Sequence, residues 1–156
     1  MEVDEHGFLQ RKEKAKAPFD AQGAIYCPFF GKKVVLNSDG FHHLQFSSRS
    51  ERNKKEQLLK FDLLPLALEV IRRAGTVQEY RDFLLEIGKK SARGEMRMKR
   101  SQFWGFDALV GENAVKIRTV IRQVGDGNVT FWSVMPLVKL KKGYKRKLFT
   151  EGIEDN

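Results

Sequence analysis

The chain has 156 residues, a length typical of one domain that folds without disulfides or a structural metal. Its one cysteine, Cys27, excludes an internal disulfide and argues against a cysteine-based zinc site, and no apolar run approaches the ~20 residues of a membrane span. A formal net charge of +9, from 29 Lys and Arg against 20 Asp and Glu, is typical of proteins that bind polyanions.

The N-terminal segment is polar and charged. It opens with acidic residues rather than the basic and then apolar order of a signal peptide, so we expect a cytoplasmic protein without membrane attachment. Residues 1–22 carry too little apolar surface to fold alone and predict a flexible arm. A single α+β domain is expected over residues 23–140, followed by a charged, basic tail over residues 141–156.

The first part of the domain carries strand and turn signals. Val34-Val35-Leu36 is a β-branched run that predicts a strand. Asn37-Ser38-Asp39-Gly40 has the composition of a turn, and the segment Phe41–Phe46 follows it directly. We expect the two adjacent histidines of that segment to lie on a strand.

Helical patterns occupy the middle of the chain. Ser50 is the expected cap of a first helix, which we expect to break at Pro65 because proline disfavours helical backbone in the residue before it. A second helix is expected to end at Gly75. The capping-box pattern of residues 76–79, followed by apolar residues at helical spacing, predicts a third helix that ends near Gly88.

The remaining chain predicts β structure. Residues 89–100 hold six basic residues and one acidic residue, which indicates a loop or strand start beside a polyanion. Strands are expected over residues 101–110, 114–124 and 128–138, separated by short turns that favour an antiparallel meander. The fold class is therefore α+β, with helices on a small antiparallel sheet.

Cations are expected to line one face of the second meander strand. Alternation puts Lys116, Arg118 and Arg122 on the same side, where they can hold a phosphate backbone, while an ordinary solvated face is the alternative. Trp132 on the next strand either stacks on a base or belongs to the core. The expected nucleic-acid-binding residues are Arg52, Lys116, Arg122, Lys99, Arg100, Lys141 and Lys142.

The pair His42-His43 is the most informative polar feature. Neighbours on a strand point to opposite faces, so one imidazole at most enters a given cleft, as a general base near neutral pH or as a structural histidine. Only His6 remains as a third histidine, and paired carboxylates for two metal ions are not apparent, so neither a metal nor another cofactor is expected.

Four segments follow one another along the chain: Val34-Val35-Leu36, Phe41-His42-His43-Leu44, Leu64-Pro65-Leu66-Ala67-Leu68-Glu69-Val70-Ile71-Arg72-Arg73-Ala74-Gly75 and Phe131-Trp132-Ser133-Val134. Their order resembles the barnase–EndoU–colicin–RelE-like nucleases, in particular their phage-associated branch. The resemblance covers roughly residues 30–138.

This resemblance implies helices packed on an antiparallel sheet of about four strands and metal-free RNA cleavage, in which the ribose 2′-OH attacks the adjacent phosphate. His42 or His43 would be the base. Arg118, supported by Lys116 or Arg52, would stabilise the charge that develops on the phosphate. The residues that would position the phosphate are Ser133 or Thr130.

Such proteins are often toxin or effector domains of phages and mobile elements. RNA is the expected partner, with DNA as the alternative substrate and an inhibitor or immunity protein as a further partner. Two other hypotheses remain open. The chain is either a non-catalytic nucleic-acid-binding protein with a basic surface, or a structural protein whose charge serves an acidic partner.

Overall fold

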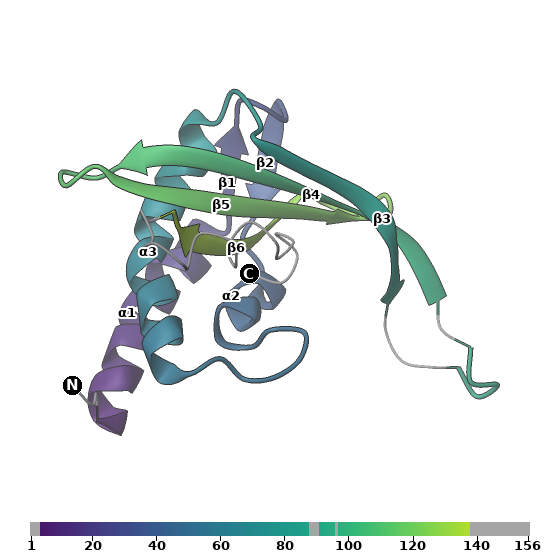
Figure 1. Ribbon diagram of the computed structural model, residues 1–156, viewed down its shortest axis with the longest axis horizontal. Helices are drawn as coiled ribbons and strands as arrows, with labels where there is room; N and C mark the ends of the chain where they lie inside the picture. The colour runs from purple at the N-terminus through teal and green to yellow at the C-terminus, as the bar shows by residue number, and fades with distance from the viewer. Residues whose placement is uncertain (1–3, 88–90, 96, 138–156) are drawn as a thin grey trace, which may run out of the picture.

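The computed structural model describes residues 4–87, 91–95 and 97–137 and shows an α+β fold (Figure 1). Within these residues, three helices pack on a six-stranded, mostly antiparallel open sheet with the strand order β1-β2-β6-β5-β4-β3. The elements are α1 (Glu5–Gln22), β1 (Ala24–Cys27), β2 (Lys32–Val35), α2 (Ser38–Gln45), α3 (Lys54–Arg73), β3 (Glu79–Ile87), β4 (Arg97–Val110), β5 (Val115–Val124) and β6 (Thr130–Pro136).

The helix α1 corrects the expectation of a flexible arm over residues 1–22. Asp4 caps it by accepting a hydrogen bond from the N–H of Gly7 at 2.7 Å, and Gly23, with φ of 68°, ends it. Phe8, Ala15 and Phe19 form one narrow stripe that is buried in the main core. The helix is therefore held by packing against the domain, although its other residues are mostly polar or charged.

The helix α2 corrects the expected turn and strand around the histidine pair. The side chain of Asn37 accepts a hydrogen bond from the N–H of Gly40 at 3.1 Å, so this turn-like composition starts a helix. Successive helical residues lie about 100° apart rather than on opposite faces. His43 is consequently buried, with 4% of its surface exposed, while His42 is exposed and stacks on Phe46.

The helix α3 runs without a break through Pro65, contrary to the two helices expected there. Asn53 caps it rather than Ser50, since its side chain accepts a hydrogen bond from the N–H of Glu56 at 2.8 Å. Buried residues occur on both sides of the proline, among them Phe61 and Ile71. Packing of this apolar face offsets the hydrogen bond that the proline removes.

The strand β3 replaces the third helix expected from residue 76. It pairs antiparallel with β4 over nine residue pairs, from Glu79↔Gly105 to Ile87↔Arg97. Phe83 on β3 stacks on Phe103 of β4 with ring centroids 5.6 Å apart. The spacing of the apolar residues in this segment fits both the repeat of a helix and the alternation of a strand. Pairing with β4 decides in favour of the strand.

The three-stranded meander is confirmed as β4, β5 and β6, but the whole sheet is larger than the four antiparallel strands expected. The hairpin of β1 and β2 adds two strands, and β2 pairs with β6 in parallel. No helix of the described residues is long and apolar enough to span a membrane.

The sheet has two different faces. One face packs against the helices and holds the main core, which includes Ile117 and Ile121 of β5, as alternation predicts. A smaller buried cluster of Phe103, Val120 and Met135 lies apart from this core. On β5, Val120 falls on the same side as Arg118 and Arg122, because side chains alternate along a strand.

The seam between β2 and β6 positions the candidate site. These strands pair only at Val35↔Thr130, so the rest of β6 has no strand partner on that side. The helix α2 packs there, and Gly40 lies so close to β6 that a Cβ at this position would overlap the carbonyl oxygen of Phe131. Trp132 has no partner on β5, since Val120 pairs with Ser133 and Ile121 with Phe131.

Candidate functional site

Six side chains meet at the seam where α2 packs beside β6, and we call them the seam cluster. They come from α2, from the loop before α3, from α3 itself and from β5 and β6. The members are His43, Arg52, Lys60, Arg122, Trp132 and Ser133. Five of the six are polar, and four of these are more than 90% buried, which is unusual for groups of this kind.

The buried pair of His43 and Arg52 forms one side of the cluster. An Nη atom of Arg52 lies 3.2 Å from Nε2 of His43, and Nε of Arg52 donates to the carbonyl oxygen of His43 at 3.1 Å. Because a guanidinium only donates, Nε2 of His43 accepts in this contact, and its ring proton then belongs on Nδ1. The same arginine forms an ion pair with Glu56 at 2.8 Å.

Trp132 joins this pair to β5. Its ring is stacked on His43 with centroids 4.1 Å apart, and the guanidinium of Arg122 lies 3.6 Å from the indole centroid. Two groups this close to one ring centre occupy opposite faces, so the indole lies between imidazole and guanidinium. Both faces of Trp132 are covered in this structure, and neither is open for a nucleic-acid base.

Lys60 forms the other side of the cluster. Its Nζ donates to the Val134 carbonyl oxygen at 2.7 Å and to Oγ of Ser133 at 3.2 Å, which satisfies a β6 carbonyl that β2 does not reach. Burial is the main cause that lowers its pKa to about 7, and the positive charge of Arg52 lowers it further. Lys60 therefore changes its charge near neutral pH.

Positive charge is in excess at the cluster. Arg52 has the carboxylate of Glu56, and Asp39 is the acidic group that acts on Arg122. Burial lowers the pKa of Arg122, and its Nε atom is buried without a hydrogen-bond partner. Three cations with few anions, at a site with a buried unpaired donor, favour binding of an anion such as phosphate.

Arg118 is placed differently from the expectation that it acts on phosphate. It donates to both carboxylate oxygens of Asp107, at 2.5 and 2.9 Å, and to Glu79 at 2.5 Å. Hydrogen bonding to Asp107 is the main cause that raises its pKa. Its charge is thus balanced by two acidic residues from β4 and β3, outside the seam cluster.

The structure brings some of the other predicted residues near the cluster and leaves others apart. Oγ1 of Thr130 donates to the carbonyl oxygen of Arg122 at 3.2 Å, which ties it to the backbone next to the cluster. Arg100 is held by Asp82, while Lys99 and Lys116 are exposed. Lys141 and Lys142 lie outside the described residues.

Lys60 is the residue that sequence reasoning missed. It lies in a helix with many charged residues, and only its position on the buried face distinguishes it from them. Phe61 and Leu64 are buried at the next position and four residues on, so helical spacing alone already places Lys60 near the apolar face. A lysine on the apolar face of a helix is the feature of the sequence that could have indicated a buried, functional Lys60.

No group of three or more His, Cys, Asp or Glu side chains within the described residues has an arrangement that holds a metal ion. No protein-family model, curated protein or solved structure significantly matches this chain.

Proposed function

We propose that this protein is a metal-independent endoribonuclease whose active site is the seam cluster. One observation carries the proposal. An imidazole and a guanidinium from separate elements lie 3.2 Å apart, and a second guanidinium on the far face of Trp132, a buried lysine and a serine complete the cluster. RNA cleavage by the 2′-OH needs a base, cations for the phosphate and a donor that positions it, and the cluster holds all three.

In this mechanism Nε2 of His43 accepts the proton of the ribose 2′-OH. The 2′ oxygen forms a bond to phosphorus and the bond from phosphorus to the 5′ oxygen breaks, which leaves a 2′,3′-cyclic phosphate, while the departing 5′ oxygen takes up a proton from water. Arg52 stabilises the negative charge on the phosphate as it develops, and Arg122 adds positive charge from the opposite face of Trp132. Ser133 and Lys60 position the phosphate oxygens from the β6 side.

The arriving phosphate also frees the base. Arg52 donates to His43 in the absence of RNA, and a charged phosphate is a stronger acceptor for a guanidinium than a neutral imidazole. When Arg52 donates its hydrogen bond to the phosphate instead, the lone pair on Nε2 of His43 is free to take a proton. Access requires movement of the loop 46–53, which carries the exposed residues Ser48, Arg49 and Ser50.

The overall charge of +9 and the resemblance to barnase–EndoU–colicin–RelE-like nucleases support the same proposal. We place RNA first as substrate because the mechanism uses the 2′-OH, which DNA lacks. A toxin or phage effector acting in the cytoplasm, with an inhibitor or immunity protein as its partner, fits an enzyme of this kind.

The test is cleavage of labelled single-stranded RNA in EDTA by the wild type, His43→Gln and His42→Gln. Glutamine keeps an acceptor for Arg52 but cannot take a proton near neutral pH. We expect His43→Gln to lose roughly 10²–10⁴-fold in rate. His42→Gln serves as the matched control and should keep its activity. Wild-type protein that leaves RNA intact, or an active His43→Gln variant, would refute the proposed base.

A second function, RNA binding without cleavage, is favoured by the burial of His43, which leaves 4% of its surface exposed. In that case Arg122 and Lys60 bind phosphate, and the histidine only supports Trp132. Tight, salt-sensitive binding of RNA that stays intact, and that His43→Gln does not weaken, would identify this second function.

A further inference from the structure

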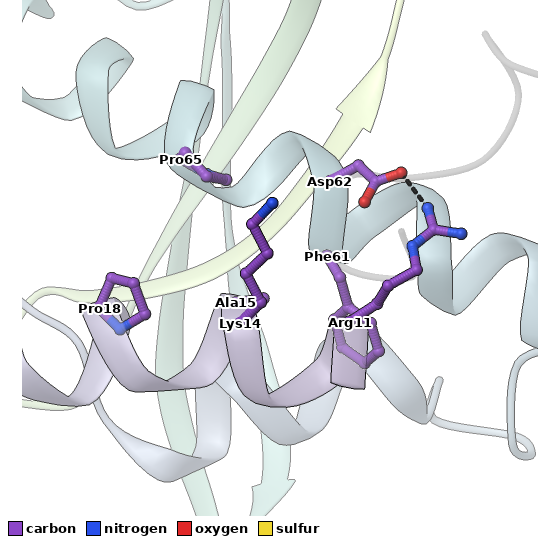
Figure 2. A pocket seen from close by; sticks show the side chains of 7 residues that line it. All are labelled: Arg11, Lys14, Ala15, Pro18, Phe61, Asp62 and Pro65. Carbon is purple, nitrogen blue, oxygen red and sulfur yellow. Dashed lines mark hydrogen bonds and ion pairs between the residues drawn. The ribbon is translucent and has the colours of Figure 1, made fainter. Parts of the chain in front are cut away.

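Two features of the described surface lie outside the seam cluster. One is a cavity between α1 and α3, where Arg11 and Asp62 pair with each other across the two helices (Figure 2). Their charges cancel, and the rest of the lining is largely apolar and selects no particular ligand. The other feature is the free edge of the sheet at β3, whose own sequence indicates what binds there.

The two edge strands of the sheet differ in how they are protected. The strand β1 has only four residues and is followed directly by Pro28, and both features keep an edge from pairing with another chain. The strand β3 has nine residues without proline or lysine, and it pairs with β4 over nine consecutive positions without a bulge. Its outer side has no strand partner within the described residues, so β3 is an open edge.

Charged residues on β3 do little to protect this edge, because three of them interact within the chain. Glu79 accepts a hydrogen bond from Arg118 at 2.5 Å, and Asp82 forms an ion pair with Arg100 at 2.6 Å. The guanidinium of Arg81 lies 5.7 Å from the centre of a phenyl ring on the same strand. An incoming strand therefore meets little unbalanced charge.

Apolar side chains lie on both faces of the same strand. Tyr80 and Leu84 share one face and are 46% and 64% exposed, while Phe83 and Leu85 share the other face and are half-buried. A long edge strand with exposed apolar residues is a surface to which a further strand can add.

We propose that β3 pairs antiparallel with β3 of a second copy of this chain, in the register that places Phe83 opposite Phe83. A twofold axis passes through this pair, as in other isologous dimers. Arg81 then faces Leu85 of the second copy, and Asp82 faces Leu84. All nine residues of β3 take part, and no two charges of the same sign lie opposite each other.

The two neighbouring registers are disfavoured by charge. An axis at Asp82 places two aspartates opposite each other, and an axis at Leu84 places Asp82 opposite Glu86 twice. With the axis at Phe83, the two exposed Leu84 side chains are diagonal neighbours on one face, and two phenyl rings meet on the other. The charges of β3 thus select a register that covers its apolar residues, and this match of the strand to itself favours a second copy over an unrelated partner.

The register is tested by oxidation of cysteine variants of the full chain. Phe83→Cys should form a disulfide with its own copy, because opposite Cα atoms in an antiparallel pair lie about 4.5–5.5 Å apart. Arg81→Cys and Leu85→Cys should not cross-link alone, since each residue is about 13 Å from its own copy, but should cross-link when mixed. The wild type is the control for the buried Cys27.

Analytical ultracentrifugation of the wild type and of edge variants tests the dimer without any use of RNA, so the outcome is independent of the proposed reaction. Leu84→Lys should weaken dimerisation about tenfold, because a lysine on an edge strand opposes pairing. Tyr26→Lys, the matched change at an exposed position of β1, should leave it unchanged. A wild type that stays monomeric at millimolar concentration would overturn the proposal, and so would cross-linking of Arg81→Cys alone or equal weakening by the two lysine variants. Circular dichroism verifies that each variant is folded.

Discussion

Two arginines on β5, Arg118 and Arg122, lie four residues apart on the same side of the strand and yet have opposite surroundings. Arg118 is held by the carboxylates of Asp107 and Glu79. Arg122 lies on Trp132, with its Nε atom buried and without a hydrogen-bond partner. The comparison teaches that the alternation of side chains along a strand predicts which cations share a face. It does not distinguish a structural arginine from one that is available to a ligand. The neighbouring carboxylates make that distinction.

The largest effect on stability is expected from Gly40→Ala. A Cβ at this position overlaps the carbonyl oxygen of Phe131, and this backbone atom cannot move aside as a flexible side chain does. We expect a loss of about 3 kcal/mol in the free energy of unfolding, together with loss of RNA binding. Denaturant unfolding measures it. Stability equal to that of the wild type would show that α2 is not fixed against β6.

Next in size is the contrast between Arg118→Met and Arg122→Met. Removal of Arg118 leaves two partly buried carboxylates without their cation, so the variant should lose about 2 kcal/mol of stability. Removal of Arg122 relieves a buried donor that has no partner, and stability should stay within about 0.5 kcal/mol. Thermal unfolding of both variants measures this contrast, and the reverse order would contradict the distinction between the two arginines.

Lys60 gives an effect that depends on pH and is smaller for each pH unit. Its pKa is about 7 in the folded protein and near 10.5 when unfolded, so above pH 7 the unfolded chain binds more protons. Stability from this group therefore rises with pH between these values and is lowest below pH 7, with a slope of at most about 1.4 kcal/mol per pH unit.

Lys60→Met should remove this slope, which unfolding curves of both proteins between pH 6 and about 9 measure. Lys12→Met serves as the control, because Lys12 lies on α1 outside the seam. Identical pH dependence in the wild type and Lys60→Met would show that Lys60 keeps its charge throughout this range.

The smallest effect is expected from Lys99→Ala. Lys99 is exposed on the part of β4 that pairs with β3, a ribbon that extends beyond the other strands in Figure 1. An exposed lysine near RNA contributes only through screened charge, so we expect affinity to fall about two- to threefold at low salt and to be unchanged at high salt. Fluorescence anisotropy measures both. A tenfold loss of affinity would indicate that RNA binds at the β3–β4 ribbon rather than at the seam.

The meander could be predicted because its signal is local. Short turns and alternating side chains fix β4, β5 and β6 without knowledge of the rest of the fold. The helix α1 was missed because its apolar stripe is only Phe8, Ala15 and Phe19 among many charges. The apolar residues of β3 are spaced in a way that fits both a helix and a strand. Only pairing with β4, which is distant in the sequence, decides between the two.

The sequence predicted which kinds of residues form the candidate site better than it predicted how they are arranged. His43, Arg52, Arg122 and Ser133 do meet at the seam, but the expected strand geometry of the histidines was wrong. The choice between His42 and His43 depends on the start of α2 at Asn37, whose side chain forms a cap rather than a turn. The carboxylates around Arg118 come from β3 and β4, and pairing between strands cannot be deduced from one strand alone.

The most direct test of the seam as the RNA site is the affinity of Arg122→Met and Arg118→Met for single-stranded RNA over a range of salt concentrations. We predict that Arg122→Met weakens binding about tenfold and lowers the slope of log affinity against log salt by about one, while Arg118→Met stays near the wild type. Equal weakening by the two variants, or a larger loss for Arg118→Met, would contradict the account.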